Sequence, residues 1–325
     1  LTHGNICAQL SQIDGWLTGL FKDGEAVVIT ALPLYHIFAL TANCITFFNY
    51  GARNVLITNP RDMPAFIKDL KKNPFSLITG VNTLFNGLLN QPAFRELDFS
   101  NLKISLGGGM AVQDAVALKW QEVTGSPLLE AYGLSETSPA ATINPTDGSH
   151  RMGTIGLPIP NTELKIFDDD KKEVPMGERG EIGIKGPQVM AGYWNRPEAT
   201  AECMHGDFFL TGDIGIMDED GFFKIVDRKK EMVCVSGFNV YPSEVEAVIS
   251  SHPKVLEVGV RSEPDPKTTE CVMAFVVKKD ESLTEDEIRD FCREKLTNYK
   301  VPKIVVFRDE LPKSNVGKIL RRMLK

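Results

Sequence analysis

The sequence predicts an α/β fold: a doubly wound, mostly parallel β-sheet, then a turn-rich β subdomain and a small C-terminal α+β domain. Three observations predict it. Strand-like and helix-like runs alternate through the first third, short strands with tight turns begin near Gly148, and a charged run at 227–231 precedes a third mixture of strands and helices. A chain of 325 residues also exceeds most single domains, so one large and one smaller domain are expected.

Strands and helices of the first third are expected in pairs. Each strand is a short run rich in β-branched residues, and each helix is a longer run with apolar residues at helical spacing. The expected strands are 25–31, 54–60, 75–80 and 103–110, and the expected helices are 35–48, 63–73, 81–90 and 112–125. Because such pairs form βαβ units, the strands should be parallel, and a ligand should bind beyond their carboxyl ends.

Two further regions follow this alternating part. We place a domain boundary at Asp227, so that residues 1–227 form part of a large domain and 228–325 a small mobile domain. The turn-rich subdomain should contain strands at 162–170 and 180–186 and a tight turn at 218–221. The small domain should contain strands at 255–261 and 271–279, a helix opening at Pro242, and a helix at 284–296 capped by Thr284.

Charge and cysteine content limit the classes of function. A formal net charge of −7 and a pI near 5.4 argue against a nucleic-acid-binding surface. The basic run at 318–325 is most simply a solvated amphipathic tail. Six scattered cysteines, without a C-x-x-C pair, indicate free thiols in a reducing compartment.

One segment has the length of a membrane span. Residues 27–52 contain no charged side chain, and a spanning helix needs about twenty apolar positions. Pro33, His36 and Asn43 interrupt the segment, however, and Asn and His are costly in lipid. A strand, a loop and a buried helix therefore explain it better.

Two motifs stand where strands are expected to end. Gly107–Gly109 would let the backbone approach a ligand closely, although a flexible turn would also explain the glycines. In YGLSE, Tyr132 offers a flat face to a planar ring, Ser135 a hydroxyl donor, and Glu136 an oxygen ligand for Mg²⁺. Taken alone, YGLSE also fits a solvated loop.

Three other positions carry polar groups of interest. Asp213 follows an apolar run, where a carboxylate can accept both hydroxyls of a ribose. The segment 312–318 ends in Lys318 but is no Walker phosphate loop, because Ile319 stands where Ser or Thr is required. Lys318 can still bring a point charge to a phosphate. His36 lies between apolar residues, which more often indicates a core histidine than a ligand.

Seven motifs occur in a fixed order over essentially the whole chain: PLYHIFAL, SLGGGM, YGLSET, GEIGIKGPQVMAGYW, LTGD, VDRKKEMVCVSGFNVYPSEVE and LPKSNVGKILRR. Together they resemble the adenylate-forming enzymes of the acyl-CoA synthetase and luciferase superfamily. The segments ITNPRDMPAF and ITGVNTLFN make the resemblance closest to the bacterial long-chain-fatty-acid–CoA ligases.

The resemblance implies a nucleotide site. Tyr132, with Gly133, would lie against adenine, Ser135 would donate to a phosphate, and Glu136 would act in catalysis by binding Mg²⁺. The region where the acyl carboxylate meets AMP would be lined by His36, as a further catalytic group, and by Gly108 and Gly109.

The resemblance also implies a moving second domain. Asp213 would bind the ribose hydroxyls with support from Arg228, and Asp227 would be the hinge. Lys318 would be the catalytic cation that bonds the acyl carboxylate and the α-phosphate during adenylation. The channel for CoA would be lined by Ser236 and Gly237.

The implied reaction is ATP-dependent conversion of a long-chain fatty acid to an acyl-adenylate and then to acyl-CoA, with release of pyrophosphate and AMP. Mg²⁺ would be the cofactor, and ATP and CoA the co-substrates. The resemblance further suggests a cytoplasmic protein, peripheral contact with the inner membrane, a homodimer and no nucleic-acid partner. The alternatives are a non-catalytic AMP- or acyl-CoA-binding module, or a ligase for another carboxylate, amino acids included.

Three departures from the family pattern qualify this expectation. Ser135 replaces the commoner Thr but keeps the hydroxyl, and Thr269-Glu270 stands where the family has Gly-Glu. The family's phosphate loop would precede Leu1, so the chain corresponds to a C-terminal portion of the full enzyme. We therefore expect these 325 residues alone to be weak or inactive in adenylation.

Overall fold

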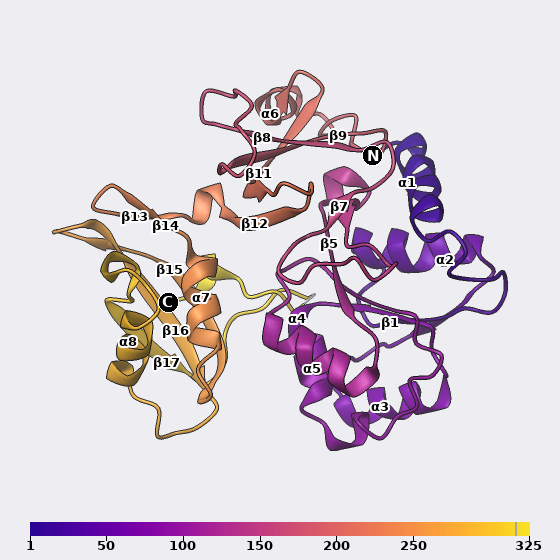
Figure 1. Cartoon of the computed structure of the whole chain (residues 1–325), viewed down its shortest axis with the longest axis horizontal. Helices are drawn as coiled ribbons and strands as arrows, with labels where there is room; N and C mark the ends of the chain where they lie inside the picture. The colour runs from indigo at the N-terminus through magenta and orange to yellow at the C-terminus, as the bar shows by residue number, and fades with distance from the viewer. Residues whose placement is uncertain (316) are drawn as a thin grey trace. The chain divides into compact units, whose positions relative to one another are not determined.

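The computed structural model describes residues 1–315 and 317–325 and is shown in Figure 1. The chain forms two compact units. The large unit comprises Leu1–Thr211 and Ile216–Lys224, and the small unit comprises Gly212–Gly215 and Ile225–Lys325.

The large unit is built on a seven-stranded sheet in the order β2-β1-β3-β4-β5-β6-β7. Its strands are β1 Val27–Thr30, β2 Arg53–Leu56, β3 Leu77–Gly80, β4 Ile104–Gly107, β5 Leu128–Gly133, β6 Ala140–Ile143 and β7 Leu157–Pro158. The first five strands pair in parallel, and β6 and β7 are antiparallel. The order of the parallel strands, 2-1-3-4-5, is one of the common doubly wound orders, so the predicted fold class is confirmed.

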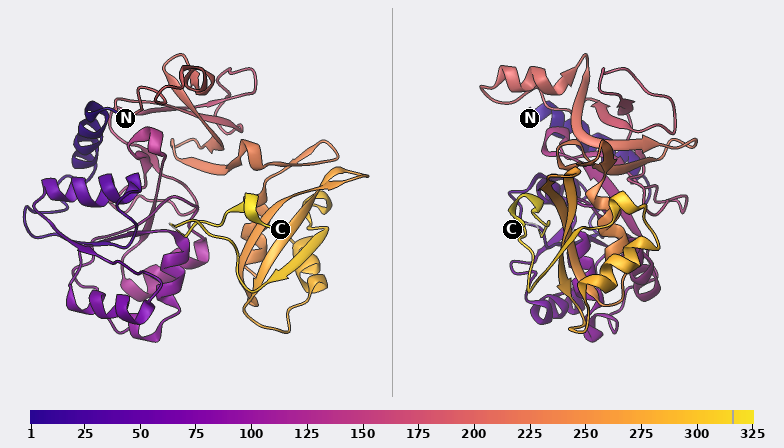
Figure 2. Two further views of the ribbon diagram at one scale, coloured as in Figure 1. Left: turned by 180° about the vertical axis from the view of Figure 1, so that it is seen from behind. Right: turned by 90° about the vertical axis from the view of Figure 1, so that its left-hand side faces the viewer.

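Helices cover both faces of this sheet, as Figures 1 and 2 show from opposite sides. The helical segments are α1 His3–Trp16, η1 Phe38–Ile45, α2 Thr46–Asn49, α3 Met63–Lys72, α4 Asn82–Leu89 and α5 Asp114–Thr124. On one face Val28 and Leu77, which are register partners, are buried with Phe47 of α2. On the other face the hydroxyl of Ser105 accepts a hydrogen bond of 2.9 Å from the indole of Trp120 in α5. The alternation of strand side chains thus supplies a core on each side.

The helix expected at 35–48 forms, but its first part has the wider π-helical turn over Phe38–Ile45. No helix in the described part of the chain is long and apolar enough to cross a membrane, which agrees with the interpretation of residues 27–52. All six cysteines are free thiols, as expected.

The turn-rich part of the chain forms a second sheet in the order β10-β11-β9-β8, with β12 beside β11. Its elements are β8 Glu163–Phe167, β9 Gly180–Lys185, α6 Pro197–Cys203, β10 Met204–His205, β11 Phe208–Met217 and β12 Phe223–Arg228. The predicted tight turn lies between β11 and β12. There the carboxylate of Asp218 accepts from the backbone N–H groups of Asp220 and Phe222, at 3.0 and 2.9 Å.

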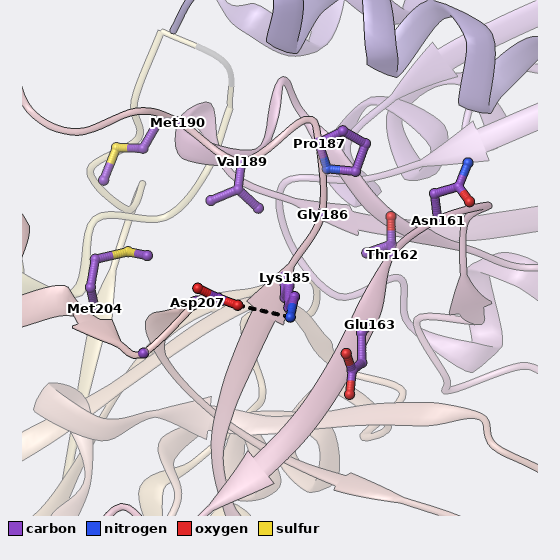
Figure 3. A pocket seen from close by; sticks show the side chains of 11 residues that line it. Asn161, Thr162, Glu163, Lys185, Gly186, Pro187, Val189, Met190, Met204 and Asp207 are labelled. Carbon is purple, nitrogen blue, oxygen red and sulfur yellow. Dashed lines mark hydrogen bonds and ion pairs between the residues drawn. The ribbon is translucent and has the colours of Figure 1, made fainter.

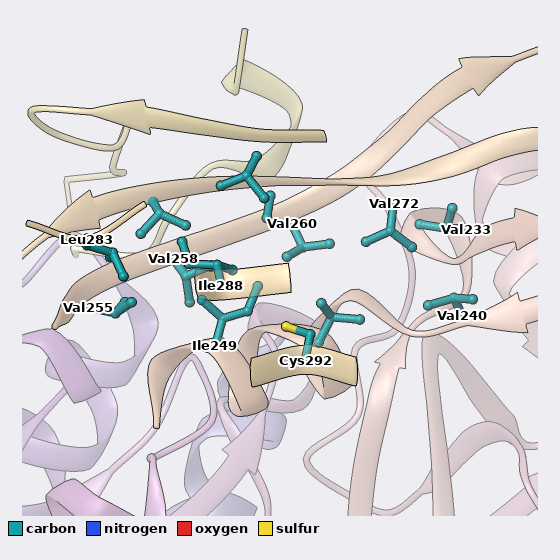
Figure 4. Packing of buried hydrophobic residues seen from close by; sticks show 14 of the residues in the cluster. Val233, Val240, Ile249, Val255, Val258, Val260, Val272, Leu283, Ile288 and Cys292 are labelled. Carbon is teal, nitrogen blue, oxygen red and sulfur yellow. The ribbon is translucent and has the colours of Figure 1, made fainter. Parts of the chain in front are cut away.

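The small unit carries a sheet in the order β14-β13-β16-β15, with β17 parallel to β16. Its elements are β13 Val233–Val235, β14 Phe238–Val240, α7 Pro242–Ser250, β15 Val255–Asp265, β16 Thr269–Lys278, α8 Glu285–Arg293 and β17 Ile304–Arg308. Valines of the sheet and Ile249 and Ile288 of the two helices form one buried cluster (Figure 4). Thr284 caps α8 as predicted, accepting from the N–H of Glu287 at 3.2 Å.

Candidate functional site

The predicted residues of the large unit lie where the parallel strands end. His36 follows β1, Gly108 follows β4, and Tyr132 is near the end of β5. A Cβ atom at Gly108 would lie 3.0 Å from the ring of Phe38 and 3.3 Å from the carbonyl oxygen of Ala131. The loop after β4 therefore lies against both Phe38, in the segment after β1, and β5, at the strand-end edge where doubly wound sheets bind ligands.

Gly133 shapes this edge through the backbone. A Cβ at Gly133 would stand 1.8 Å from the carbonyl oxygen of Pro139, which no side chain tolerates. The N–H of Leu134 donates to the same oxygen at 3.0 Å. Gly109 has a φ of +75°, in the left-handed region that favours glycine. These glycines are structural requirements of the edge and leave the backbone open to a ligand.

His36 is partly exposed at the end of β1 and is not the core residue that its apolar neighbours indicate. Its Nδ1 accepts from the N–H of Phe38 at 3.3 Å. Burial lowers the pKa of His36 below its usual value of 6.5, so the imidazole is mostly neutral at pH 7. A neutral imidazole can donate one hydrogen bond to a carboxylate without adding charge.

Ser135 and Glu136 lie in the helical turn η3, Ser135–Thr137, directly after β5. Ser135 is exposed, as a phosphate donor would need to be. The Glu136 carboxylate accepts from the hydroxyl of Tyr193 at 2.8 Å, and its backbone oxygen accepts from the N–H of Met190, also at 2.8 Å. The segment after β9 therefore holds Glu136 at two points.

Glu136 is the carboxylate predicted from the sequence as a ligand for a magnesium ion. Among the described residues, no group of three or more His, Cys, Asp or Glu side chains could hold a metal. Magnesium is commonly bound by one or two carboxylates together with substrate phosphates. One carboxylate beside an exposed hydroxyl therefore fits a metal shared with phosphates and does not fit a closed metal centre.

Asn43 of the π-helical segment was not predicted as a site residue. Its side-chain amide donates to Thr30 of β1 at 3.0 Å and to Thr79 of β3 at 2.8 Å. Between β1 and β3 the strand order changes direction, which is where such sheets open a crevice. Asn43 ties these strand ends together. An uncharged polar residue inside an apolar helical run was the signal in the sequence.

Glu130 on β5 was also missed. It is 9 % exposed, and its carboxylate accepts from the N–H of Val112, in the loop after the glycine run, at 3.1 Å. Burial raises the pKa of Glu130 to about 7, and the nearby Asp114 acts in the same direction. The carboxylate thus connects β5 to the glycine loop. An acid within an apolar strand was its signal.

A pocket of about 710 Å³ lies on the turn-rich part of the large unit (Figure 3). Its lining includes Met190, Met204 and the ion pair of Lys185 with Asp207, whose nitrogen and oxygen are 2.9 Å apart. None of the described residues predicted for the site lines it. Met190 connects the pocket to the predicted site, because its N–H donates to the backbone oxygen of Glu136.

In the small unit, Asp213 and Arg228 form an ion pair with 3.2 Å between Nε and Oδ1. The side chain of Asp213 is 5 % exposed and that of Arg228 is 51 % exposed. The family resemblance assigned both residues to the binding of the ribose hydroxyls, and in the structure their side chains form an ion pair.

Lys318 belongs to the same charged group. Burial, which is the larger cause, and the positive charge of Arg228 lower its pKa, whereas Asp213 and Glu231 raise it. Lys318 is therefore partly buried within electrostatic range of the Asp213–Arg228 pair. Val316, within the predicted turn 312–318, lies outside the described residues.

Asp227 is 2 % exposed and fully engaged within the small unit. Its carboxylate accepts from the backbone N–H groups of Arg228 at 2.7 Å and Ser243 at 2.6 Å, and from the guanidinium of Arg321 at 2.8 Å. Arg321 corrects one expectation: the basic run at the chain end is not simply a solvated tail, because the Arg321 side chain is only 14 % exposed.

Ser236 and Gly237 form the two-residue turn between β13 and β14, since Val235 and Phe238 are register partners. Their φ angles are +51° and +85°. Positive φ at both central residues is typical of the type I′ hairpin turn. The structure therefore presents these two residues at a hairpin tip.

Comparison with known proteins identifies the family of the chain. The family model described as AMP-binding enzyme matches residues 1–194, and that described as AMP-binding enzyme C-terminal domain matches residues 244–318. The long-chain-fatty-acid–CoA ligase of Escherichia coli O6:H1 is 57% identical over all 325 residues, and that of Bacillus subtilis is 41% identical over 327 aligned positions. The chain spans 58% of the length of each of these relatives.

Solved structures show the same fold. ATP-bound MatB from Rhodopseudomonas palustris matches with a TM-score of 0.89 and 32% identity, covering 99% of this chain and 63% of that one. o-Succinylbenzoate CoA synthetase (MenE) from Bacillus subtilis, in complex with the intermediate OSB-AMP, matches with a TM-score of 0.86 and 30% identity, covering 100% and 65%. With one family model covering residues 1–194 and a second covering most of the small unit, the chain belongs to the family of AMP-binding enzymes.

Proposed function

We propose that this chain carries the nucleotide- and CoA-handling part of an ATP-dependent long-chain-fatty-acid–CoA ligase. The observation that carries the proposal is the charged group of Asp213, Arg228 and Lys318 in the small unit. A buried carboxylate is suited to accept from the two hydroxyls of a ribose. A partly buried ammonium is suited to a phosphate and a carboxylate that must be brought together.

In the first half-reaction, the fatty carboxylate oxygen attacks the α-phosphorus of ATP and pyrophosphate leaves. Lys318 would hold the carboxylate and an α-phosphate oxygen, offsetting the negative charge of both groups. Burial and the positive charge of Arg228 lower the pKa of Lys318, and the negative charges of Asp213 and Glu231 oppose this shift. Tyr132 would lie against the adenine, and the hydroxyl of Ser135 would donate to a phosphate.

Glu136 would hold Mg²⁺ together with phosphate oxygens, and the bound metal would supply compensation for the phosphate charge. The hydrogen bond from Tyr193 at 2.8 Å orients the Glu136 carboxylate for this task. His36, Gly108 and Gly109 would line the place where the acyl carboxylate meets the nucleotide. A Cβ at Gly108 would lie 3.0 Å from the ring of Phe38, so a larger residue would crowd this loop.

In the second half-reaction, the CoA thiol attacks the acyl carbon and AMP leaves. We propose that residues 228–325 turn about Asp227 between the two steps, which withdraws Lys318 and presents the hairpin tip of Ser236 and Gly237 to CoA. Two reactions with different requirements would thus share one nucleotide site. A cytoplasmic location, peripheral contact with the inner membrane and a homodimer belong to the same proposal; the first is supported by the free cysteines and the resemblance, and the other two by the resemblance.

The experiment is a comparison of the two half-reactions in a Lys318→Ala variant of the longest natural polypeptide that contains these residues. Fatty-acid-dependent ATP–pyrophosphate exchange should fall on the order of 100-fold or more, because one charge-stabilising group is lost. Thioester formation from a supplied acyl-adenylate should stay within a few-fold. Lys325→Ala removes an exposed lysine near the chain end and is the matched control. Equal loss of both half-reactions would refute the alternation of roles.

Two rival functions are outcomes of the same experiment. A ligase for another carboxylate is favoured by feruloyl-CoA synthase of Amycolatopsis sp, which is 36% identical over 325 residues. Exchange supported better by an aromatic or dicarboxylic acid than by palmitate would select it. AMP or acyl-CoA binding without any exchange would indicate a non-catalytic module. The same assay on the 325-residue chain alone tests the expectation that it adenylates weakly.

A further inference from the structure

The loop that carries Lys318 is closed by its own hydrogen bonds. The N–H of Leu320 donates to the carbonyl oxygen of Pro312, and the N–H of Ser314 to that of Lys318, both at 2.8 Å. The N–H of Lys318 donates to the hydroxyl of Ser314 at 3.1 Å. Lys318 is thus placed by its loop, and the loop in turn must be placed by its two ends.

The two ends of the loop are attached differently. Near the start of the loop, Lys313 forms an ion pair with Glu257 of β15, with 2.7 Å between the nitrogen and the oxygen. After the loop, Leu324 is 3 % exposed and packs on Gly259 of β15, where a Cβ would lie 3.0 Å from Leu324. Between Lys318 and Leu324, Ile319 also packs on Gly259, and the polar attachment is made by Arg321.

Arg321 uses all five of its N–H donors. Its Nε donates to Glu246 at 2.9 Å, one terminal nitrogen to Asp227 at 2.8 Å and Glu231 at 2.6 Å, and the other to Ser243 at 2.7 Å and Glu246 at 2.6 Å. A lysine offers a point charge from one nitrogen and cannot reproduce this fork. The geometry therefore requires arginine at this position.

The partners of Arg321 come from two segments. Asp227 and Glu231 belong to the segment 227–231, and Ser243 and Glu246 belong to α7. Ser243 closes the arrangement, because its N–H donates to Asp227 at 2.6 Å while its hydroxyl accepts from Arg321. The next residue, Arg322, is exposed, so the pattern singles out one of two adjacent arginines.

We infer that Arg321 is a positioning residue that fastens the Lys318 loop to the segment 227–231 and to α7, so that Lys318, Asp227 and Arg228 move as one body. This inference rests on the proposed roles of Lys318 in adenylation and Asp227 as the hinge. It adds that the hinge segment and the lysine loop are joined by one guanidinium. Rotation at Asp227 would therefore carry Lys318 rigidly out of the nucleotide site.

The first test is hydrogen exchange of an Arg321→Lys variant, in the longest natural polypeptide that contains the chain. Amides of residues 313–320 and 227–231 should exchange at least about 10-fold faster than in the unchanged protein, because the fork that joins them is lost. Amides of α8 should be unaffected. Arg322→Lys is the matched control and should leave all these rates unchanged. Unchanged exchange in Arg321→Lys would overturn the inference.

The second test separates positioning from general stability. Arg321→Lys should lower ATP–pyrophosphate exchange about 10- to 100-fold while thioester formation from supplied adenylate changes less than about 3-fold, since only the first step needs a placed Lys318. Equal loss of both steps would overturn the positioning role. If the unchanged protein shows no ATP–pyrophosphate exchange, the proposed function is wrong. Hydrogen exchange of the backbone amides would still decide whether Arg321 fastens the loop.

A milder variant serves if Arg321→Lys does not fold. Ser243→Ala removes one acceptor of the guanidinium and leaves the four carboxylate contacts in place. Amides of 313–320 should then exchange about 2- to 5-fold faster, with adenylation reduced by a similar factor. Ser250→Ala changes a half-buried serine of the same helix whose hydroxyl donates to the carbonyl oxygen of Ala247, and it is the control; indistinguishable results for the two serines would overturn the inference.

Discussion

The strand-end loops of the large unit and the charged cluster of the small unit are built on different principles. At the strand ends, Gly133 allows two backbone segments to approach where any side chain would collide, and a Cβ at Gly108 would crowd the ring of Phe38. In the small unit, Arg321 and its carboxylates join segments that are about 75 to 94 residues apart in sequence. The first site is therefore sensitive to the size of a residue, and the second to its charge and to the number of donors it carries.

The largest effect expected from this difference is that of Gly133→Ala. The added methyl group would stand 1.8 Å from the carbonyl oxygen of Pro139, so β5 and the following turn must separate. We expect a loss of about 4 kcal/mol or more in the free energy of unfolding, or no folded protein. Chemical denaturation followed by circular dichroism measures it.

Gly125→Ala is the control. It separates the effect of a close contact made by the added methyl group from the effect of backbone strain. Gly125 has a positive φ of +71°, which Gly133 does not have, and a Cβ at Gly125 meets nothing within 4 Å. Its cost should be about 1 kcal/mol, the strain of a left-handed alanine. If both variants lose the same free energy, the close approach at Pro139 is not what makes Gly133 necessary.

The second effect concerns Glu130, the buried acid of the large unit. Its pKa of about 7 when folded, against a usual 4.5, means that the folded protein holds the proton more tightly. Between about pH 4.5 and 7 the unfolded state has released this proton and the folded state has not, so stability falls as pH rises. Over this pH range, the titration of Glu130 should lower the free energy of unfolding by about 3 kcal/mol.

Glu130→Gln should remove that part of the pH dependence, because an amide does not titrate and still accepts from the N–H of Val112. Unfolding free energies at pH 5 and pH 7.5 measure the difference. Glu122→Gln is the control: its carboxylate is paired with exposed Lys119, which holds the pKa below the usual range, so the variant should keep the full slope. A slope retained in Glu130→Gln would show that another group titrates there.

The position of the large unit's predicted residues at the strand ends could be predicted from the sequence because their signals are local. The glycines, Tyr132 and Glu136 lie within short motifs, and the alternation of strands and helices places those motifs at one edge of a sheet. Asp213 with Arg228 needed the family resemblance, because β11 and β12 bring them together over fifteen positions. At Glu130 and Asn43 the sequence shows only a polar residue within an apolar run, and this pattern does not identify the partners of the side chain.

Arg321 could not have been predicted, for a physical reason. A basic run at a chain end is normally solvated, and nothing in KILRR distinguishes Arg321 from Arg322. The distinction arises only when α7 and the segment 227–231 supply three carboxylates on one side of the chain. Long-range charge clusters depend on the folded arrangement, whereas glycine turns are recorded in the local sequence.

The smallest effect compares one device that both units share, the helix N-cap. Asp62 accepts from the N–H of Ala65 at 3.1 Å in α3, and Thr284 accepts from that of Glu287 at 3.2 Å in α8. The first turn of α8 carries three acids that favour the helix dipole, and the first turn of α3 carries none. Asp62→Ala should therefore cost about 1 kcal/mol and Thr284→Ala about half of that. Hydrogen exchange of the first-turn amides would measure this as roughly five-fold and two-fold acceleration. The reverse order would mean that the acids of α8 are bound to their neighbours Arg289 and Lys254 and do not support the helix end.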